Sequence, residues 1–261
     1  MLEQAERLAR GAGDLLAKRY GTLRRADAAR KQGHRRDLVT KADLEAERYV
    51  AAHIPAGDSL LAEEGGARGG DARRLWIVDP LDGTVNFLHG IPFWCVSIGV
   101  VEAGELVAGV VHAPALDETF SAARGKGCFL NGTPVKVADT AQLSDAVLAS
   151  GFGYRLDELP DTNLDNWAAL TLASAGTRRL GSAALDLAYV ACGRFDGFFE
   201  LHLNPWDVAA GALLVTEAGG RVTDYRGSPA LDAFLHGRSI LATNSRLHDA
   251  LRSKLAPLRG L

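Results

Sequence analysis

The sequence predicts a mixed α/β fold, built as one domain with two lobes. Its 261 residues are 47% hydrophobic, which provides a sizeable core without a disulfide framework. The first half carries two helical patterns followed by strand-like runs, which indicate two helices and a largely antiparallel sheet. The second half alternates short strands with helices, as is typical of an α/β layer. No repeat or flexible linker separates the halves, so we predict a single domain over residues 1–261, with lobes of about 1–140 and 141–261.

The elements of the first half follow from hydrophobic periodicity and turn signals. Apolar residues recur at helical spacing over residues 2–20, with charged residues on the other face. Thr40 and Asp43 have the spacing of a capping box at the start of a second helix. The Asn131-Gly132 pair suits the tight turn of a hairpin. The predicted elements are helices over residues 2–20 and 40–53, a glycine-rich turn over 65–70, and strands over 75–78, 95–101 and 106–111.

The elements of the second half alternate in type. Gly181-Ser182 is a start signal for a helix that continues to about Cys192. Asp207 precedes an apolar run long enough for another helix. The predicted elements are strands over 146–149, 178–180, 198–199, 221–223 and 240–242, and helices over 164–175, 181–192, 208–218 and 245–258.

Composition excludes several classes of protein. The chain has 29 Lys and Arg against 32 Asp and Glu, a balance that argues against gripping nucleic acid or an anionic membrane as its main role. Cys95, Cys128 and Cys192 lie far apart and form no CxxC pair, so no zinc site is predicted. The start of the sequence lacks the pattern of a signal peptide, and the longest apolar stretch, residues 91–101, is too short to span a bilayer. We therefore expect a soluble, cytoplasmic protein.

A basic connector follows the first helix, over residues 24–36. We expect it to be a solvated connector. Electrostatic steering of an anionic substrate is the next interpretation. RNA binding is the third, because no aromatic residues interleave the charges. Neither Lys31 nor Gln32 has an assigned function at this level.

Four acidic positions stand where an acid is unusual. Asp79 directly follows a buried strand, and Asp82 comes three residues later in a turn. Glu63, followed by Glu64, ends a short apolar run, and Asp207 precedes an apolar helix. Each position taken alone has a structural interpretation, as a turn residue, a solvated loop or a helix cap. Only their combination points to chemistry.

Asp79 and Asp82 bracket a turn, so their carboxylates and the Leu81 carbonyl can converge on one point. Two like charges about 4 Å apart repel by roughly 4 kcal/mol at an effective dielectric near 20. No Lys or Arg lies between residues 75 and 124 to offset that repulsion. Hard oxygen ligands of this kind suit Mg²⁺, which usually keeps waters and binds substrate phosphate as well. The combination therefore predicts a magnesium site.

Gly83 and Thr84 extend the same turn. A glycine lets backbone N–H groups approach an anion closely, and a helix that opens here favours phosphate. The Thr84 hydroxyl can orient a metal-bound water. The turn therefore predicts a phosphate site beside the metal site.

The chain closely resembles the inositol monophosphatase family, in segments that cover nearly all of it in the right order. The principal matching segments are residues 61–65, 76–87 and 205–211. Further matches are residues 37–40 with Asp43, residues 125–132 and residues 216–220. The resemblance implies a layered αβαβα sandwich, the fold of inositol monophosphatases and sugar phosphatases. It also implies a homodimer that hydrolyses phosphate monoesters with two or three Mg²⁺ and is inhibited by lithium.

The resemblance also implies roles for individual residues. The metal ligands would be Glu63, Asp79, the Leu81 carbonyl, Asp82 and Asp207. Glu63 and Thr84 would position and activate the attacking water. The phosphate would lie against Leu81, Asp82, Gly83 and Thr84. The alcohol would face Gly181, Ser182, Ala183, Glu200 and Asp207.

The substrate implied first is myo-inositol 1-phosphate, because the family uses an acid at the position of Glu200 to accept hydrogen bonds from ring hydroxyls. The same chemistry on histidinol phosphate, fructose 1,6-bisphosphate or a nucleotide 3′-phosphate is the alternative. A second alternative is a partner in RNA or transcription complexes, since some bacterial relatives act in that way. The presence of all four acids argues for catalysis.

Overall fold

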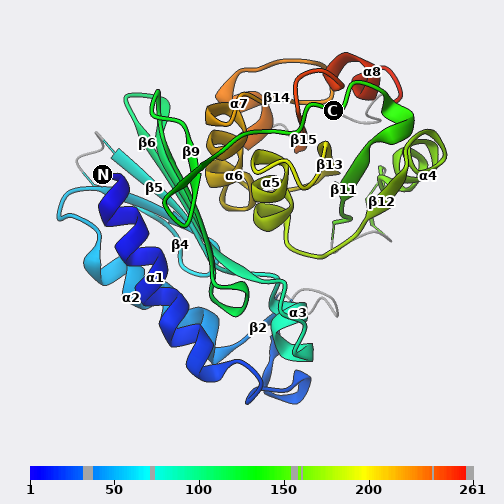
Figure 1. Cartoon of the computed structure of the whole chain (residues 1–261). Coiled ribbons are helices and arrows are strands. Elements are labelled where there is room, and N and C mark those ends of the chain that lie inside the picture. Colours follow the sequence, from blue (N-terminus) through cyan, green and yellow to red (C-terminus); the bar gives the residue numbers. More distant parts are fainter. Residues whose placement is uncertain (32–37, 71–73, 154–157, 160, 237, 257–261) are drawn as a thin grey trace.

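The computed structural model describes residues 1–31, 38–70, 74–153, 158–159, 161–236 and 238–256. Its helices and sheets form five layers in the order αβαβα, which confirms the predicted fold class (Figure 1). An eight-stranded sheet comes from the first half of the chain, and a five-stranded sheet comes from the second half. That the whole chain forms one domain remains a prediction.

The first sheet has the strand order β10-β9-β8-β7-β6-β5-β3-β4. Its strands are β3 (Ser59–Ala62), β4 (Gly66–Arg68), β5 (Arg74–Asp82), β6 (Cys95–Glu102), β7 (Glu105–Ala113), β8 (Glu118–Ala123), β9 (Cys128–Leu130) and β10 (Thr133–Val135). Only the β3–β5 pair is parallel, and the hairpin predicted at Asn131-Gly132 joins β9 to β10. A separate ribbon pairs β1 (Ala29–Arg30) with β2 (Leu38–Val39).

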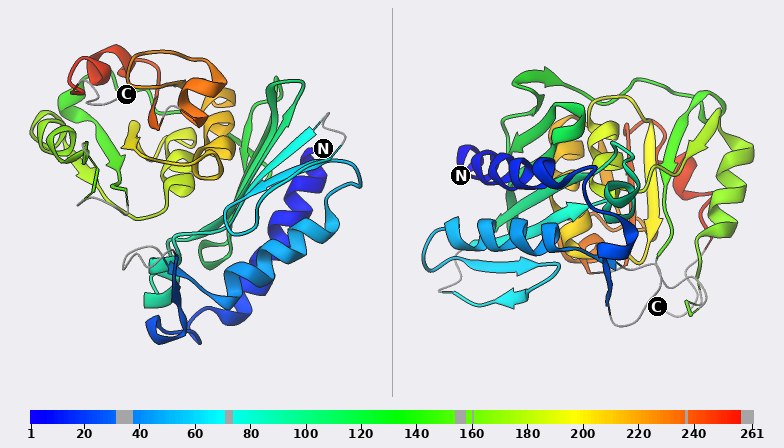
Figure 2. Two further views of the ribbon diagram at one scale, coloured as in Figure 1. Left: turned by 180° about the vertical axis from the view of Figure 1, so that it is seen from behind. Right: turned by 90° about the horizontal axis from the view of Figure 1, so that it is seen from below.

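Two helices, α1 (Leu2–Arg19) and α2 (Lys41–His53), cover one face of this sheet (Figure 2). The α1 face that carries Leu8 and Leu16 is buried against the sheet, in one cluster with Trp76. The predicted capping box starts α2, where Thr40 Oγ1 accepts the Ala42 N–H at 3.0 Å. A capping box fixes where a helix begins, and here it also places Asp43 in the interior.

The middle layer consists of α5 (Ala183–Ala191) and α6 (Pro205–Glu217), and both helices are buried on nearly all sides. A helix that is apolar all round is typical of such an internal position. The packing of α6 on the first sheet depends on small residues. A Cβ at Gly99 would lie 2.8 Å from the Ala209 Cβ, and one at Gly109 would lie 2.8 Å from the Ala210 carbonyl oxygen. The helix therefore rests directly on the sheet backbone.

The second sheet has the strand order β12-β11-β13-β15-β14. Its strands are β11 (Val147–Ser150), β12 (Gly176–Arg178), β13 (Gly197–Leu201), β14 (Arg221–Thr223) and β15 (Ser239–Thr243). Successive side chains of β13 point to opposite faces, so Phe198 joins the middle-layer core while Phe199 packs in the outer cluster. The remaining helices are α3 (Thr84–His89), α4 (Leu164–Ala173), α7 (Leu231–Leu235) and α8 (His248–Arg252).

Several boundaries differ from the sequence prediction. The strand predicted over 75–78 is β5, which continues through Asp79 to Asp82, and the turn predicted over 65–70 contains β4. The strand predicted over 178–180 lies at Gly176–Arg178, and Leu180 has left the sheet because its carbonyl accepts the Asn86 side-chain amide at 2.8 Å. The last helix, predicted over 245–258, is shorter. It covers only His248–Arg252, since Ser245 has a left-handed backbone that a helix does not tolerate. Residues 257–258 of that prediction lie outside the described part of the chain.

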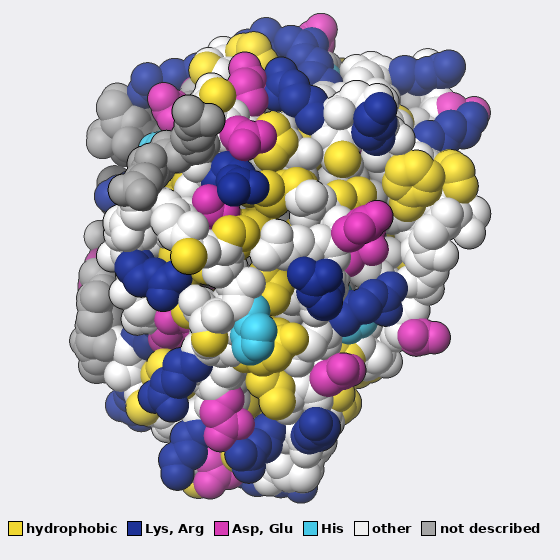
Figure 3. Space-filling model, turned by 90° about the vertical axis from the view of Figure 1, so that its left-hand side faces the viewer, with side chains coloured by type: hydrophobic (Ala, Val, Ile, Leu, Met, Phe, Trp, Pro, Cys, Tyr) yellow, Lys and Arg dark blue, Asp and Glu magenta, His cyan; other side chains and the backbone are white. Residues whose placement is uncertain are grey.

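None of the helices in the described ranges is long and apolar enough to cross a membrane. On the face that carries α1 and α2, Lys and Arg side chains alternate with Asp and Glu (Figure 3). Among the described residues in this view, neither sign of charge gathers into one patch.

Candidate active site

One pocket contains all the residues predicted for the site. It opens where β3 and β5 end, facing the first turns of α5 and α6. Its lining includes Glu63, Asp79, Leu81, Asp82, Gly83, Thr84, Gly181, Ser182, Ala183, Glu200 and Asp207. The fold therefore brings together segments that are far apart in the sequence.

The end of β5 presents the first two acids. The pairing of β5 with β6 shifts register between Asp79 and Asp82, so the strand departs from regular geometry at this point. The Leu81 N–H donates to Asp79 Oδ1 at 2.9 Å, which closes the turn. Gly83 then adopts φ +92°, and a Cβ there would lie 2.9 Å from the Phe93 carbonyl oxygen. Only glycine fits this position, which directs the chain into α3.

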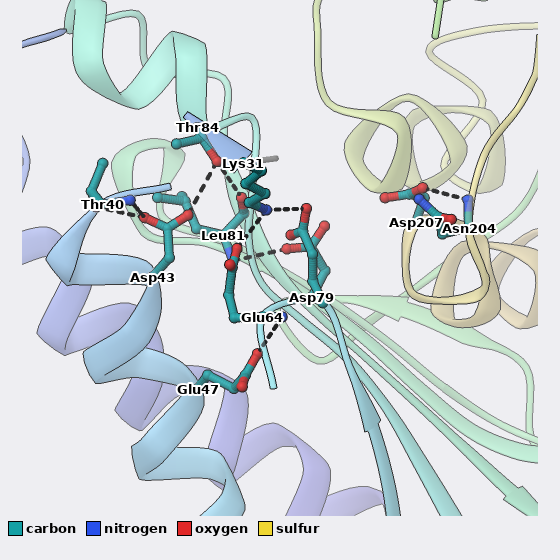
Figure 4. Close-up of polar contacts among 11 residues, drawn as sticks. Lys31, Thr40, Asp43, Glu47, Glu64, Asp79, Leu81, Thr84, Asn204 and Asp207 are labelled. Atoms are coloured by element: carbon teal, nitrogen blue, oxygen red, sulfur yellow. Dashed lines mark hydrogen bonds and ion pairs between the residues drawn. The ribbon is translucent and has the colours of Figure 1, made fainter. Parts of the chain in front are cut away.

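Thr84 is held in place by a residue from α2. Its Oγ1 lies 3.2 Å from Asp43 Oδ1 and 3.1 Å from the Leu81 carbonyl oxygen (Figure 4). Asp43 Oδ2 in turn accepts the Thr40 N–H at 3.0 Å and the Thr40 hydroxyl at 2.5 Å. Burial raises the pKa of Asp43 to about 6. Sequence reasoning treated Asp43 as a capping and motif residue and missed this contact.

Asp82 is fixed by the start of α5. Its Oδ2 accepts the Ser182 hydroxyl and the Ala184 N–H, both at 2.7 Å. A carboxylate is favoured at a helix N-terminus by the free N–H groups and the helix dipole. Burial raises the pKa of Asp82 to about 6, although these two hydrogen bonds oppose the rise.

Asp207 reaches the pocket from α6. It is the third residue of that helix and accepts the Asn204 N–H at 2.7 Å, so it completes a capping box. Figure 4 shows it on the other side of the site from Asp79. The sequence offered Asp207 as the cap that precedes the helix; it is instead the third residue of α6, with Asn204 as the N-cap, and its carboxyl group also lines the pocket.

The carboxylates of the pocket disfavour one another's charge. Asp79 is 2% exposed, and burial, followed by the charges of Glu63, Asp82 and Asp207, raises its pKa well above the usual range. Burial and the charges of Asp82 and Glu63 also raise the pKa of Asp207 well above its usual range. Buried like charges need a cation beside them to stay ionised. The donor set, oxygen atoms from carboxylates and one backbone carbonyl, is the kind that fits Mg²⁺.

The acids line the pocket without converging on a single point. Over the ranges that the structure describes, no three Asp, Glu, His or Cys side chains are grouped closely enough to hold an ion. The Leu81 carbonyl accepts its hydrogen bond from Thr84. Closure around a cation therefore requires side chains to move across the pocket.

Lys31 supplies a positive charge to the site. Its Nζ lies 2.6 Å from Glu63 Oε1 and 2.5 Å from Glu64 Oε1. Burial lowers the pKa of Lys31, but the two carboxylates outweigh that effect and raise it above its usual value. Glu47 holds the same loop by accepting the Glu64 N–H at 2.8 Å. The connector was expected to be solvated, yet Lys31 faces inward; residues 32–36 lie outside the described part of the chain.

The side of the pocket assigned to the alcohol is also acidic. Burial raises the pKa of Glu200 to about 8. Its carboxyl group rests on the backbone of Gly151, where a Cβ would lie 2.2 Å from Glu200 Oε2. Asp186, Arg179 and His202 line the same pocket and were not predicted to. The signal that could have found Asp186 is an acid inside an otherwise apolar helix.

Comparison with known proteins agrees with this geometry. Residues 1–258 match the model of the inositol monophosphatase family. The chain is 41% identical to an inositol-1-monophosphatase of Mesorhizobium japonicum, over 92% of this chain and 90% of that protein. It is also 41% identical to the Nus factor SuhB of Pseudomonas aeruginosa, over 98% of this chain and 96% of that protein. The structure of an inositol monophosphatase from Anabaena superposes with a TM-score of 0.85 at 42% identity, covering 98% of this chain and 96% of that one.

Proposed function

The chain belongs to the inositol monophosphatase family, and we propose that it is a Mg²⁺-dependent phosphatase whose substrate is myo-inositol 1-phosphate. Family membership supports hydrolysis of a phosphate monoester. The observation that carries the proposal is the pocket itself, in which the acids predicted from separate segments line one cavity. The metal, the alcohol and the residue roles given below belong to the proposal.

Glu63, Asp79, the Leu81 carbonyl, Asp82 and Asp207 would hold two or three Mg²⁺. When bound, these ions neutralise phosphoryl oxygens, lower the pKa of a water and stabilise the leaving oxygen. The protein contributes the positions of its ligands. α5 orients Asp82, and the capping box of α6 orients Asp207.

The attacking water would be positioned by Thr84 and Glu63. The Thr84 hydroxyl has one proton, which it donates to Asp43 or to the Leu81 carbonyl. Its lone pairs are then free to accept a hydrogen bond from the water. Glu63 provides a second acceptor and can take up the proton of the water. Asp43 would act as a positioning residue through its hydrogen bond with Thr84.

The phosphate would lie against Leu81, Asp82, Gly83 and Thr84. The alcohol would face residues 181–183, Glu200 and Asp207. We favour inositol because Glu200 is a buried acid that can bond a ring hydroxyl, and a site built for a hydroxyl discriminates strongly against analogues without it. Histidinol phosphate, fructose 1,6-bisphosphate and a nucleotide 3′-phosphate remain the alternatives.

The test is phosphate release from these four substrates, with and without Mg²⁺. Inositol 1-phosphate should be hydrolysed fastest, and only with the metal. Asp79→Asn and Asp82→Asn should each lower the rate by more than about 100-fold, as the removal of one charge-stabilising group does, while the fold survives. The matched control is Asp58→Asn, since Asp58 is also buried but bonds Arg74 and Trp76 at the other end of β5. Normal turnover in either site variant would reject the assignment.

The proposal also includes lithium inhibition and a homodimer in the cytoplasm. Titration of the Mg²⁺-dependent rate with lithium tests the first property. Light scattering of the purified protein tests the second. A rate indifferent to lithium, or a monomer at all concentrations, would remove that part of the proposal.

A binding role in transcription is the second candidate, and the relative named as a Nus factor favours it. Capture of RNA polymerase or ribosomal components at physiological salt would support it. The Asp79→Asn variant separates the two functions, because a binding role should survive the loss of catalysis. The described residues in Figure 3 have mixed charges and form no basic patch for nucleic acid on that face.

A further inference from the structure

Asp186 is a buried acid that nothing in the described fold accounts for. It lies in α5, is 1% exposed and lines the pocket. Its Oδ1 is fully buried and has no hydrogen-bond partner within the described part of the chain. Its neighbours in the helix, Leu185 and Leu187, are buried core residues. An apolar side chain would suit the helix better than this acid does.

Two other buried acids of the chain, Asp82 and Asp196, have hydrogen-bond partners for their carboxyl groups, which Asp186 Oδ1 lacks among the described residues. Asp82 accepts two hydrogen bonds at the start of α5. Asp196 accepts the Val147 N–H at 2.8 Å and the Asn244 amide at 3.3 Å. Leaving a buried polar atom without a partner costs about 1–3 kcal/mol. A cost of this size at the wall of a substrate pocket indicates that the partner is the ligand, which Asp186 meets when its side chain turns toward the pocket.

Glu200 presents a second carboxyl group to the same part of the pocket. It extends from β13, which contacts α5 (Figure 1). After burial, the charge of Glu200 is the largest influence on the pKa of Asp186, and it raises that pKa. The exposed Arg179 lines the pocket beside both acids and lowers the pKa of each. Asp186, Glu200 and Arg179 thus border the region assigned to the alcohol, together with Asp207.

We propose that Asp186 is a specificity-determining residue that hydrogen-bonds a hydroxyl group of the alcohol, while Glu200 bonds another. This inference rests on the proposed phosphatase function and narrows its substrate class. The site would take a phosphate monoester of a polyhydroxylated alcohol with hydroxyl groups that reach both α5 and β13. A hydroxyl group both donates and accepts, so it pairs with a carboxyl group in either protonation state. An alcohol without that hydroxyl leaves Asp186 Oδ1 buried and unpaired.

The experiment compares two substrates across two variants of Asp186. The first substrate is a polyol phosphate, either inositol 1-phosphate or fructose 1,6-bisphosphate, whichever the wild type hydrolyses faster. The second is p-nitrophenyl phosphate, whose leaving group has no further hydroxyl. Asp186→Leu keeps the branching of the side chain at Cγ and has no hydrogen-bonding group. It should lower kcat/KM for the polyol phosphate by about 10- to 100-fold, and that for the nitrophenyl ester by less than about 3-fold. Asp186→Asn keeps an oxygen acceptor, so its kcat/KM for the polyol phosphate should fall by less than about 10-fold.

Thermal unfolding separates a ligand-binding role from a structural one. If Asp186 serves the ligand, Asp186→Leu should unfold at the same temperature as the wild type or higher, because a buried unpaired oxygen is gone. The control is Asp196→Asn, which should lower stability and leave the ratio of the two kcat/KM values unchanged. Should Asp186→Leu fail to fold, Asp186 is structural and the inference is wrong.

The outcomes also distinguish this inference from the function on which it rests. If the wild type hydrolyses neither substrate, the proposed function fails and the role of Asp186 fails with it. If the wild type hydrolyses both and Asp186→Leu slows both equally, only the role of Asp186 is overturned. A selective loss on the polyol phosphate, with stability kept, supports both.

Discussion

Replacing Lys31 by Met should destabilise the metal-free protein and make its stability more dependent on Mg²⁺. The ammonium group lies 2.6 Å from Glu63 Oε1 and 2.5 Å from Glu64 Oε1. Without it, the Lys31 charge no longer offsets the repulsion of the two carboxylates for each other and for the remaining acids of the pocket. A divalent ion that binds Glu63 would then replace the missing charge.

The size of the effect follows from the geometry. At an effective dielectric near 20, unit charges 2.6 Å apart attract by about 6 kcal/mol. The side chains of Lys31 and Glu63 are 17% and 19% exposed, so desolvation and residual screening offset part of this attraction. We expect the free energy of unfolding to fall by about 3 kcal/mol, which is the lower end of the range for removing one partner of a buried ion pair. For a chain of this length that loss corresponds to a fall in Tm of about 6 °C.

The assay is thermal unfolding at pH 8, without metal and with increasing Mg²⁺. Saturating Mg²⁺ should restore at least half of the fall in Tm, because an ion that binds only the folded state stabilises it. Lys126→Met is the control, since Lys126 is exposed and its substitution leaves the backbone N–H in place. An equal fall at every Mg²⁺ concentration, or no fall without metal, would refute the reasoning.

Two further predictions concern stability away from the pocket. Glu217 accepts the N–H groups of residues 125–127 at 2.8–3.0 Å. Glu217→Ala should therefore lower the free energy of unfolding, measured in urea, by about 3 kcal/mol, and Glu217→Gln should lower it less. Equal free energies for both variants and the wild type would contradict this. His248 is fully buried between the hydroxyls of Thr223 and Thr243, and burial with nearby arginines lowers its pKa to about 4 from 6.5. The unfolded chain therefore takes up the proton first, and stability falls as the pH drops from about 6.5 toward 4. The stability gap between the wild type and His248→Asn should narrow by about 2 kcal/mol from pH 8 to pH 5, whereas a constant gap would show that His248 does not titrate in this way.

The elements of the fold could be predicted where residues close in sequence carry a clear capping or turn signal. The capping residues Thr40 and Asp43 and the turn at Asn131-Gly132 have signals that act over a few residues, and both features are present. β8 (Glu118–Ala123) was missed because Glu118, Thr119 and Ser121 weaken its apolar pattern, and pairing with β7 and β9 determines it. Such pairing is a tertiary effect that propensity cannot anticipate.

The same distinction applies to the site. Asp79 and Asp82 could be singled out because acids at the end of an apolar run are unusual, although both lie within β5, and both line the pocket. The contact of Asp43 with Thr84 spans 41 residues, and that of Lys31 with Glu63 spans 32. No local pattern indicates contacts over such distances.

The central claim is that the acids of this pocket bind divalent cations, and anomalous diffraction from crystals soaked in Mn²⁺ tests it most directly. We expect at least two strong peaks, one near Glu63 and Asp79 and one between Asp82 and Asp207. A map with manganese only on the outer surface, from crystals of an enzyme that is active with the same ion, would contradict the claim.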